Sequence, residues 1–501
     1  MVDVIAFLIV LTSVLLLVLL IKLLLPAANK TSSSYGPKSY PLIGCLIPFY
    51  RNRHRLLHWY TDLLANSPSS TITLSRLGAR RTIVTANPCN VEHILSTNFH
   101  NYPKGKPFTD ILGDLLGRGI FNSDGHLWLS QRKVASHAFT LRSLRDLINH
   151  ILRPEISTHF LPNLVADGRT VVDLQNLLRG LSFRVICRVF LGPSTAHLQL
   201  AEALDVASEI SAGRGSAPLA FLWKAKRALG FGSERRLREA VDLIHRLVME
   251  IILKTREMNN PSNSFLSRLL EMGIHGEDEE IRDMVISFLM AGRDTTSSAL
   301  TWFFWLVSTH PDVEEKIINE INNKLIRSEE EMSYESLKKL SYLEASLMES
   351  MRLYPPVAWD SKHAEGDDVL PDGTTISKGD RIMYFPYGMG RTEALWGKNW
   401  KEFRPERWVA AGGGGVVRMS PYKFPVFQAG PRVCLGKEMA MIQMKFMAAT
   451  FLRRFELRWV GKEAPVMVPL LTAHMAGGLP VVIGERERER GGRAPSLSLA
   501  I

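Results

Sequence analysis

The chain has 501 residues, of which 46% are hydrophobic and 22% charged, and its formal net charge is +11. This composition indicates a globular chain, not a disordered one, and allows a large buried core. The positive charge suits an anionic membrane or an acidic partner, and because no zinc-finger spacing or RNA-binding motif accompanies it, we expect no nucleic acid as a partner. The 4 cysteines share no short ligand spacing, which argues against a disulfide framework.

The N-terminal segment is apolar enough to span a membrane. Residues 4–21 carry no charge, and a spanning helix needs about 20 apolar residues, so we expect a transmembrane anchor at 1–25. Basic residues follow it, including Lys22, Lys30 and Lys38, which places the remaining chain in the cytosol by the positive-inside rule. A buried core helix is the alternative. Residues 26–44, rich in Ser, Gly and Pro, are expected to form a stiff linker.

The segment 45–484 is expected to be one large domain. Strand-like alternation occurs at 71–74, 82–85 and 479–483, whereas helical periodicity dominates from 124 to 353. Pro311 fits the first position of a helix. The expected fold class is therefore mainly α with small β-sheets, followed by a disordered charged tail at 485–501.

Three motifs within this domain are ambiguous by themselves. Trp128 and Arg132 share a helix face at a spacing of four, as a core Trp beside a surface Arg also would. Asp294 and Thr295 interrupt the apolar stretch 284–307, either inside one helix or as the capped break between two helices. Glu349 and Arg352 share a face as well, as in an ordinary surface ion pair; further on, Arg407 closes a Pro-Glu-Arg segment.

The most informative stretch is the loop with Phe427, Gly430, Arg432, Cys434 and Gly436, which precedes a helical pattern. A helix N-terminus favours a thiolate, so we expect a lowered pKa for the Cys434 thiol. Gly430 and Gly436 let the backbone approach a flat ligand and direct N–H groups at the sulfur, and Arg432 offers a cation to an anionic group. A lone cysteine after Gly-Pro is more often structural, but the full F-x-x-G-x-R-x-C-x-G spacing is specific.

This loop resembles the haem-binding loop of the cytochrome P450 family, and the other motifs follow in the family's order. The resemblance implies that Cys434 is the axial ligand of a haem b iron and that the fold is the cytochrome P450 fold, preceded by the transmembrane helix. It also implies that Trp128, Arg132 and Arg432 contact haem propionates. Lys362, ten residues after Arg352 with His363 adjacent, takes a similar place in many members.

The resemblance assigns roles to the remaining motifs too. Thr295 would order water beside the bound oxygen, and Asp294 would help to relay protons. Glu349, Arg352 and Arg407 would form a buried charge network behind the haem loop, where buried charges persist only as a paired set.

Several stretches, among them 101–106, 113–117 and 387–391, look like the plant fatty-acid omega-hydroxylases, a branch that includes jasmonoyl-isoleucine hydroxylases. This implies an O2-dependent monooxygenase of the endoplasmic reticulum membrane that receives electrons from NADPH through a cytochrome reductase. Its substrate would be a fatty acid or a fatty-acid-derived hormone, hydroxylated at the terminal carbon. The alternatives are a haem-thiolate hydroperoxide isomerase or lyase and a non-catalytic haem-binding membrane protein; the Asp294–Thr295 pair argues against both.

Oxidation of a chain end requires a narrow apolar slot that positions the substrate. The candidate lining residues are Phe108, Leu112, Leu115, Phe288, Val357 and Met475. The candidates for binding a substrate carboxylate are Lys104, Arg118 and Arg214.

Overall fold

The computed structural model describes residues 35–486 apart from 165, 193–197, 218, 258–263, 272–277, 326–331 and 413–414. The expected transmembrane anchor at 1–25 therefore lies outside the described residues, as does the expected tail from residue 487 onward. Within the described part of the chain, no helix is both long and apolar enough to cross a bilayer.

The described chain is mainly helical with four small sheets, which confirms the expected fold class. The α-helices are α2 (Leu46–Arg51), α3 (Leu56–Ala65), α4 (Pro88–Glu92), α5 (Gly105–Leu116), α6 (Gly125–Ser136), α7 (Leu141–Asp146), α8 (Arg153–Glu155), α9 (Leu174–Phe190), α10 (Leu198–Ser216), α11 (Ala220–Leu229), α12 (Ser233–Glu257), α13 (Phe265–Glu271), α14 (Asp278–Ser308), α15 (Pro311–Lys324), α16 (Tyr334–Lys338), α17 (Ser341–Leu353), α18 (Pro386–Met389), α19 (Glu393–Trp396) and α20 (Lys437–Arg454). The strands are β1 (Thr71–Leu74), β2 (Thr82–Thr85), β3 (Asp167–Asp173), β4 (Asp360–His363), β5 (Asp368–Val369), β6 (Thr375–Ile376), β7 (Arg381–Tyr384), β8 (Phe455–Trp459), β9 (Met467–Val468), β10 (His474–Met475) and β11 (Pro480–Glu485).

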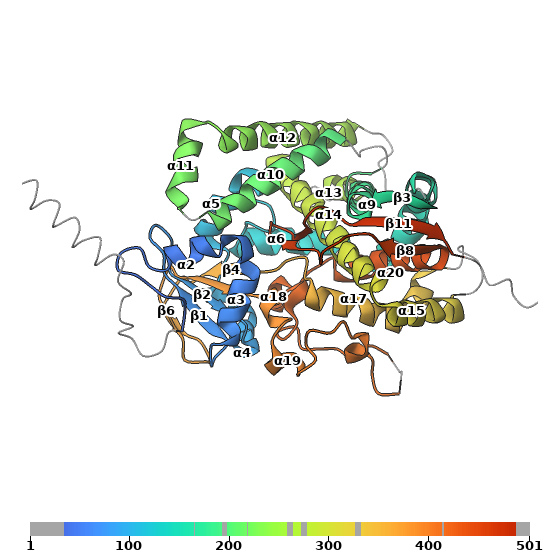
Figure 1. Ribbon diagram of the computed structural model, residues 1–501. Coiled ribbons are helices and arrows are strands. Elements are labelled where there is room, and N and C mark those ends of the chain that lie inside the picture. The colour runs from blue at the N-terminus through green and yellow to red at the C-terminus, as the bar shows by residue number, and fades with distance from the viewer. Residues whose placement is uncertain are drawn as a thin grey trace, which may run out of the picture.

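Helix α14 runs through the middle of the molecule (Figure 1). It packs along α9 and also contacts α5, α12, α17 and α20. Because neighbours cover it on several sides, most of its residues are buried, including polar ones such as Arg293 and Asp294. The helix is continuous from Asp278 to Ser308, so the alternative of a capped break at Asp294 and Thr295 is wrong.

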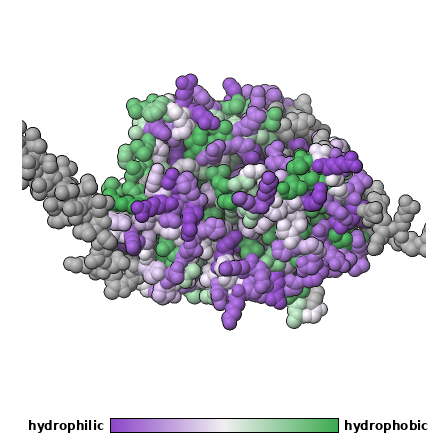
Figure 2. Space-filling model, in the orientation of Figure 1, coloured by the Kyte–Doolittle hydropathy of each residue, from purple (hydrophilic) through white to green (hydrophobic). Residues whose placement is uncertain are grey.

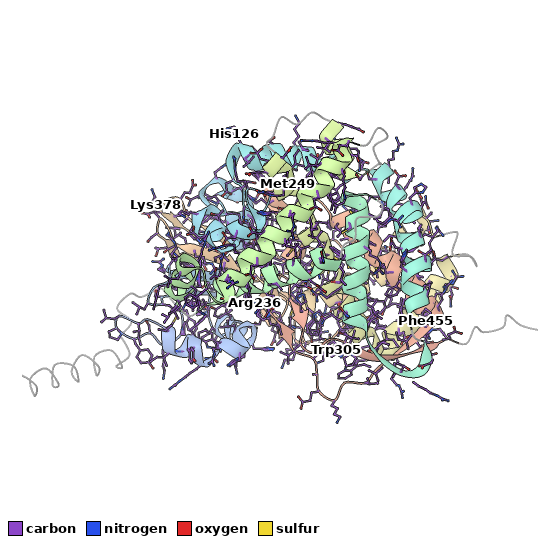
Figure 3. The ribbon with its side chains drawn as sticks, turned by 90° about the horizontal axis from the view of Figure 1, so that it is seen from above. His126, Arg236, Met249, Trp305, Lys378 and Phe455 are labelled. Carbon is purple, nitrogen blue, oxygen red and sulfur yellow. The ribbon has the colours of Figure 1, made fainter. Side chains whose placement is uncertain are left out.

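The two larger sheets lie on opposite sides of α14 (Figure 1). One has the strand order β1-β2-β7-β4 and the other β3-β11-β8. Figure 3, which views the molecule from above, places Lys378, just before β7, and Phe455, the first residue of β8, towards opposite ends. In the first sheet Leu74 lies opposite Thr82, and Thr82 lies opposite Arg381, so the three residues form one row across three strands.

The predicted elements are largely confirmed. Strands β1 and β2 coincide with the expected segments 71–74 and 82–85, and Pro311 is the first residue of α15. Strand β3, by contrast, lies inside the region expected to be helical. Its side chains are mostly exposed, so they carry no apolar alternation, and the strand exists because it pairs with β11.

The described end of the expected linker lies against the first sheet. The amide of Thr73 donates to the carbonyl oxygen of Tyr35 (2.7 Å), and the amide of Cys45 donates to that of Ser75 (2.7 Å). Gly36 is tightly packed there, since a Cβ on it would lie 2.3 Å from the Thr73 oxygen. Residues 35–45 therefore run beside β1 and the residues that follow it.

Candidate haem site

A cavity of about 280 Å³ lies between α14, α20, α6 and the loop that carries Cys434. Most of the site residues expected from the sequence line it, although they come from distant parts of the chain. They are Trp128, Arg132, Thr295, Lys362, Phe427, Arg432, Cys434 and Gly436. Two expected residues, Asp294 and Gly430, do not line it.

Cys434 lies two residues before the N-cap of α20, as the helical pattern indicated. Its amide donates to the Phe427 carbonyl (2.8 Å), and its accessible surface faces the cavity rather than the outside of the molecule. Burial raises the pKa of the free thiol, although the Gly436 amide and the charges of Arg132 and Lys437 act in the opposite direction. The expectation of a lowered pKa is therefore wrong for the thiol alone. A bound metal cation removes the proton of a coordinating thiol outright, and these donors then stabilise the anion.

The two glycines of the loop have different roles. Gly436 lies beside the sulfur, and a Cβ there would be 4.0 Å from Sγ of Cys434 and 3.5 Å from the Phe139 ring. Gly430 has φ +63°, and a Cβ there would lie 2.0 Å from the carbonyl oxygen of Leu95. Gly430 thus permits a left-handed turn and a close backbone contact, not the approach of a ligand as we expected.

One wall of the cavity carries Arg432, Trp128 and Arg132. Nη2 of Arg432 donates to Oδ1 of Asp124 (2.6 Å), and its guanidinium carbon lies 4.4 Å from the centre of the Trp128 ring. Its Nε is buried and lacks a hydrogen-bond partner among the described residues. Nη2 of Arg132 donates to the Val433 carbonyl (2.7 Å), which ties α6 to the cysteine loop.

Lys362 of β4 supplies a further cation to the same cavity. It is fully buried, and its Nζ lies 3.6 Å from Oδ2 of Asp360, beyond hydrogen-bonding distance. Asp360 is held instead by Lys104, at 2.6 Å. Burial lowers the pKa of Lys362 well below its usual value, and the charge of Lys104 lowers it further. His363 does not line the cavity, and its Nδ1 contacts the Lys104 carbonyl at 2.7 Å.

The residues present fit a haem group. The Nε of Arg432 and the Nζ of Lys362 leave donors unused on the cavity wall, and an anionic ligand would use both. A thiol faces the same cavity from the loop before α20. An iron porphyrin with carboxylate side chains matches this donor set, with the thiolate on the metal and the carboxylates on the cations.

On α14, Thr295 lines the cavity together with Ala291 and Gly292. Its Oγ1 donates to the Ala291 carbonyl (2.6 Å), so the hydroxyl oxygen remains able to accept a hydrogen bond from a polar group in the cavity. Asp294 is 2% exposed and points elsewhere: its Oδ1 lies 3.7 Å from Nε of Arg293 and 3.9 Å from Nη2 of Arg179. Successive residues of a helix are about 100° apart, which is why the two side chains have different surroundings.

The predicted charge network is confirmed by the geometry. Arg352 forms a two-pronged ion pair with Glu349, with both N–O distances 2.8 Å, and both side chains are fully buried. Arg407 donates to the same carboxylate (3.1 Å), as does the indole of Trp408 (2.8 Å). The neighbouring residue on α17, Met351, lines the cavity, so the network supports its wall from behind.

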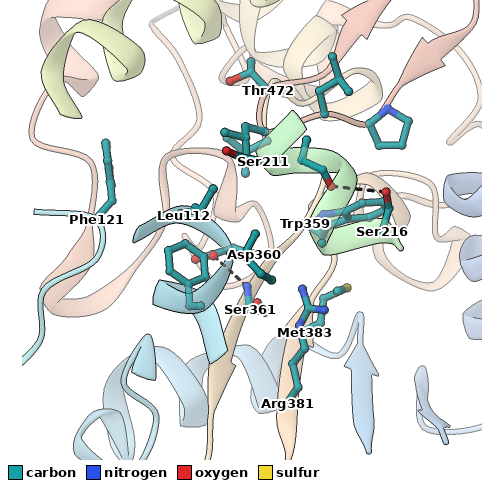
Figure 4. A pocket seen from close by; sticks show the side chains of 18 of the residues that line it. Leu112, Phe121, Ser211, Ser216, Trp359, Asp360, Ser361, Arg381, Met383 and Thr472 are labelled. Atoms are coloured by element: carbon teal, nitrogen blue, oxygen red, sulfur yellow. Dashed lines mark hydrogen bonds between the residues drawn. The ribbon is translucent and has the colours of Figure 1, made fainter. Parts of the chain in front are cut away.

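A second cavity of about 270 Å³ adjoins the first (Figure 4). The two cavities lie next to each other, because they share the lining residues Lys104, Phe121, Ala291, Thr295, Val357, Asp360 and Gln428. The expected lining residues are confirmed for Phe108, Leu112 and Val357 here and for Phe288 in the first cavity, whereas Leu115 and Met475 belong to the core.

The three basic residues expected to bind a substrate carboxylate all have carboxylate partners in the protein. Lys104 pairs with Asp360, Arg118 with Glu280 (3.3 Å), and Arg214 with Glu234 and Asp114. Arg118 and Arg214 also lie outside both cavities. Asp360 and Gln428, which line both cavities, were missed because Asp360 stands in no recognisable motif and Gln428 occupies a variable position of the cysteine loop. Gln428 has φ +63° and accepts a hydrogen bond from the Tyr384 hydroxyl.

The fold and the cysteine-lined cavity together define a haem-thiolate enzyme. The chain belongs to the cytochrome P450 family, whose model matches residues 35–475. It is 55% identical to cytochrome P450 94B1 of Arabidopsis thaliana (92% of this chain, 93% of that protein) and 52% identical to cytochrome P450 94B3 of the same plant (91% and 93%). Cytochrome P450 94A1 of Vicia sativa is 44% identical (90% and 91%). Membership makes the protein a monooxygenase that works with a redox partner.

Proposed function

We propose that this monooxygenase hydroxylates the terminal carbon of a fatty acid or of a fatty-acid-derived hormone such as jasmonoyl-isoleucine. The cofactor is haem b, and the electrons come from NADPH through a cytochrome reductase. The observation that carries the proposal is the position of Thr295, which lines both the cavity of Cys434 and the adjoining apolar cavity. An apolar chain end in the second cavity would meet the reacting centre beside this residue.

When bound, the haem supplies the activation of O2 and the oxidation itself. The protein contributes position and charge. Cys434 provides a thiolate supported by the Gly436 amide, and Arg432 and Lys362 hold anionic groups on the cavity wall. The Thr295 hydroxyl, anchored to the Ala291 carbonyl, orders a water within the cavity. Asp294 lies outside the cavity beside Arg179, and it would supply protons from that side of α14.

Attack at the chain end requires that the substrate be held lengthwise, because the terminal C–H bonds are the strongest of an alkyl chain. The second cavity suits this, since Phe108, Leu112 and Val357 give it an apolar wall on the way to Thr295. Substrates with a carboxylate at one end and an alkyl chain at the other would fit such an apolar cavity, with the alkyl end towards Thr295.

We further propose that the protein is a single-pass protein of the endoplasmic reticulum membrane, with the anchor at 1–25, the linker at 26–44 and the domain 45–484 in the cytosol. Support comes from the uncharged run 4–21 and from the surface of α11. Phe221, Leu222, Leu229 and Phe231 are each more than half exposed on or next to this helix, and Figure 2 shows a hydrophobic patch there. A patch of this kind suits contact with lipid.

The test is a reductase-coupled assay with NADPH that compares saturated fatty acids with jasmonoyl-isoleucine and identifies the hydroxylated carbon. We expect oxidation at the terminal carbon of at least one of them. Conversion of a fatty-acid hydroperoxide without NADPH, with no product from either acid, would instead identify an isomerase or lyase.

A further inference from the structure

Two arginines line the second cavity, one from strand β7 and one from the segment that follows β1. Arg381 is the first residue of β7 and stands in one row with Thr82 and Leu74, all three of which line the cavity. Arg76 lies two residues after the end of β1, in an isolated bridge with Gly44, and it lines the cavity as well. Figure 4 shows Arg381 and Met383 on one strand, with both side chains directed into the pocket.

Neither arginine has an anionic partner among the described residues. Nη1 of Arg76 is buried without a hydrogen-bond partner, and its guanidinium lies 3.8 Å from the centre of the Phe49 ring. For the side chain of Arg381 the described part of the chain shows neither an ion pair nor a hydrogen bond. The buried Arg352 and Arg214, by contrast, each hold a glutamate.

The positive charge of Arg76 adds to the free-energy cost of burying the charged Arg381. Burial lowers the pKa of Arg381, and the nearby positive charge of Arg76 lowers it further. Tyr60 lines the same cavity, but burial raises its pKa to about 12, so it is neutral and offsets nothing. Asp360 is already shared by Lys104 and Lys362. Asp360 therefore acts on Arg381 only from a distance, and neither arginine has a carboxylate in direct contact among the described residues. A bound anion would supply that contact.

We propose that Arg76 and Arg381 form the binding site for the substrate carboxylate. Guanidinium groups bind carboxylates through paired, charge-assisted hydrogen bonds, and two of them can hold both oxygens. The pair lines the second cavity but not the cavity of Cys434, whereas Thr295 lines both. A substrate held by its carboxylate at the arginines thus extends its chain towards Thr295, and its length selects the carbon that is oxidised. This inference rests on the proposed function.

The test is a binding titration of the haem-loaded enzyme with two acids, dodecanoic acid and jasmonoyl-isoleucine, and with their methyl esters. The variants are Arg76→Gln, Arg381→Gln and the double variant. The matched control is Arg80→Gln, because Arg80 is exposed and donates to the Gly379 carbonyl outside the cavity. A carbon monoxide difference spectrum confirms that each variant is folded and loaded.

We expect each substitution to raise the dissociation constant of an acid about tenfold or more and to leave that of its ester nearly unchanged. The hydroxylation site should also spread inward from the terminal carbon. If only one acid binds more weakly to the variants, that acid shows whether the arginines bind the carboxylate of a free fatty acid or that of the amino-acid conjugate. Equal effects on acid and ester, or acid binding that survives in the double variant, would overturn the inference. If the wild-type enzyme oxidises neither acid although it consumes NADPH, the proposed function fails and the carboxylate site fails with it.

Discussion

The guanidinium of Arg432 lies 4.4 Å from the centre of the Trp128 ring, which joins the cysteine loop to α6 at the wall of the haem cavity. Asp124 satisfies only part of this guanidinium, and the buried Nε has no partner among the described residues. The contact positions a cation whose Nε remains free to bind the cofactor.

Replacing Arg432 by Gln should therefore weaken haem retention. A charge-assisted hydrogen bond is worth about 1.5–3 kcal/mol, so we expect the rate of haem transfer to a scavenger protein to rise roughly 10- to 100-fold. Arg236→Gln, at an exposed position of α12, serves as the control. Equal haem loss from both variants would contradict the assigned role.

Replacing Cys434 by Ser should remove the spectroscopic signature of the thiolate ligand. The oxygen of serine is a poor donor to haem iron, so the reduced carbon monoxide complex should absorb at a different wavelength, and turnover should cease. The exposed Cys89 gives the matched control, since Cys89→Ser should leave the spectrum and the activity unchanged. An unaltered spectrum in the Cys434 variant would remove the basis for the haem site.

Replacing Thr295 by Ala should separate NADPH consumption from product formation. The hydroxyl that orders water in the cavity is lost, so we expect NADPH oxidation to continue while product per NADPH falls several-fold. Thr301→Ala is a stringent control, because Thr301 makes the same type of bond, to the Ser297 carbonyl (2.7 Å), on the same helix but lines neither cavity. Simultaneous measurement of NADPH, product and hydrogen peroxide checks this, and similar coupling in both variants would count against Thr295.

Replacing Glu349 by Gln should destabilise the domain strongly. The substitution leaves Arg352 and Arg407 without their shared counter-charge in a buried setting, which costs about 3–5 kcal/mol. The exposed pair of Glu335 with Arg145 is the comparison, and Glu335→Gln should have little effect because solvent screens that pair. Thermal unfolding of the two variants should differ by several degrees, and equal midpoints would refute the structural role.

His363 should contribute to the loss of stability in acid. Burial lowers the pKa of its imidazole from 6.5 to about 4. Between these values the unfolded chain binds a proton that the folded chain does not, so the free energy of unfolding is fully retained above pH 6.5 and falls as the pH drops towards 4, by about 3 kcal/mol at most.

His363→Asn can still donate to the Lys104 carbonyl but cannot titrate, so its denaturation midpoint should depend less on pH over this range. The measurement is urea denaturation at several pH values, with His150→Asn at an exposed position as the control. An identical pH profile for wild type and the His363 variant would show that another group is responsible.

The sequence by itself determined the elements and the chemistry of the metal ligand. Local periodicity and the proline at position 311 placed helices and strands, and the spacing around Cys434 indicated a haem loop, because these signals act between residues close together in the chain. Local patterns did not predict β3, because its exposed side chains show no apolar alternation. They also did not predict the role of Gly430, where a glycine is required by the close contact with the distant Leu95 carbonyl.

Only the tertiary structure decided which charges are satisfied. It paired Lys104, Arg118 and Arg214 with carboxylates, directed Asp294 away from the cavity, and left Arg76 and Arg381 facing an apolar space. These outcomes depend on strand register and helix packing between segments far apart in the chain. The partner of a charged side chain is set by that packing, because electrostatic energy depends on distance and burial and not on the order of residues.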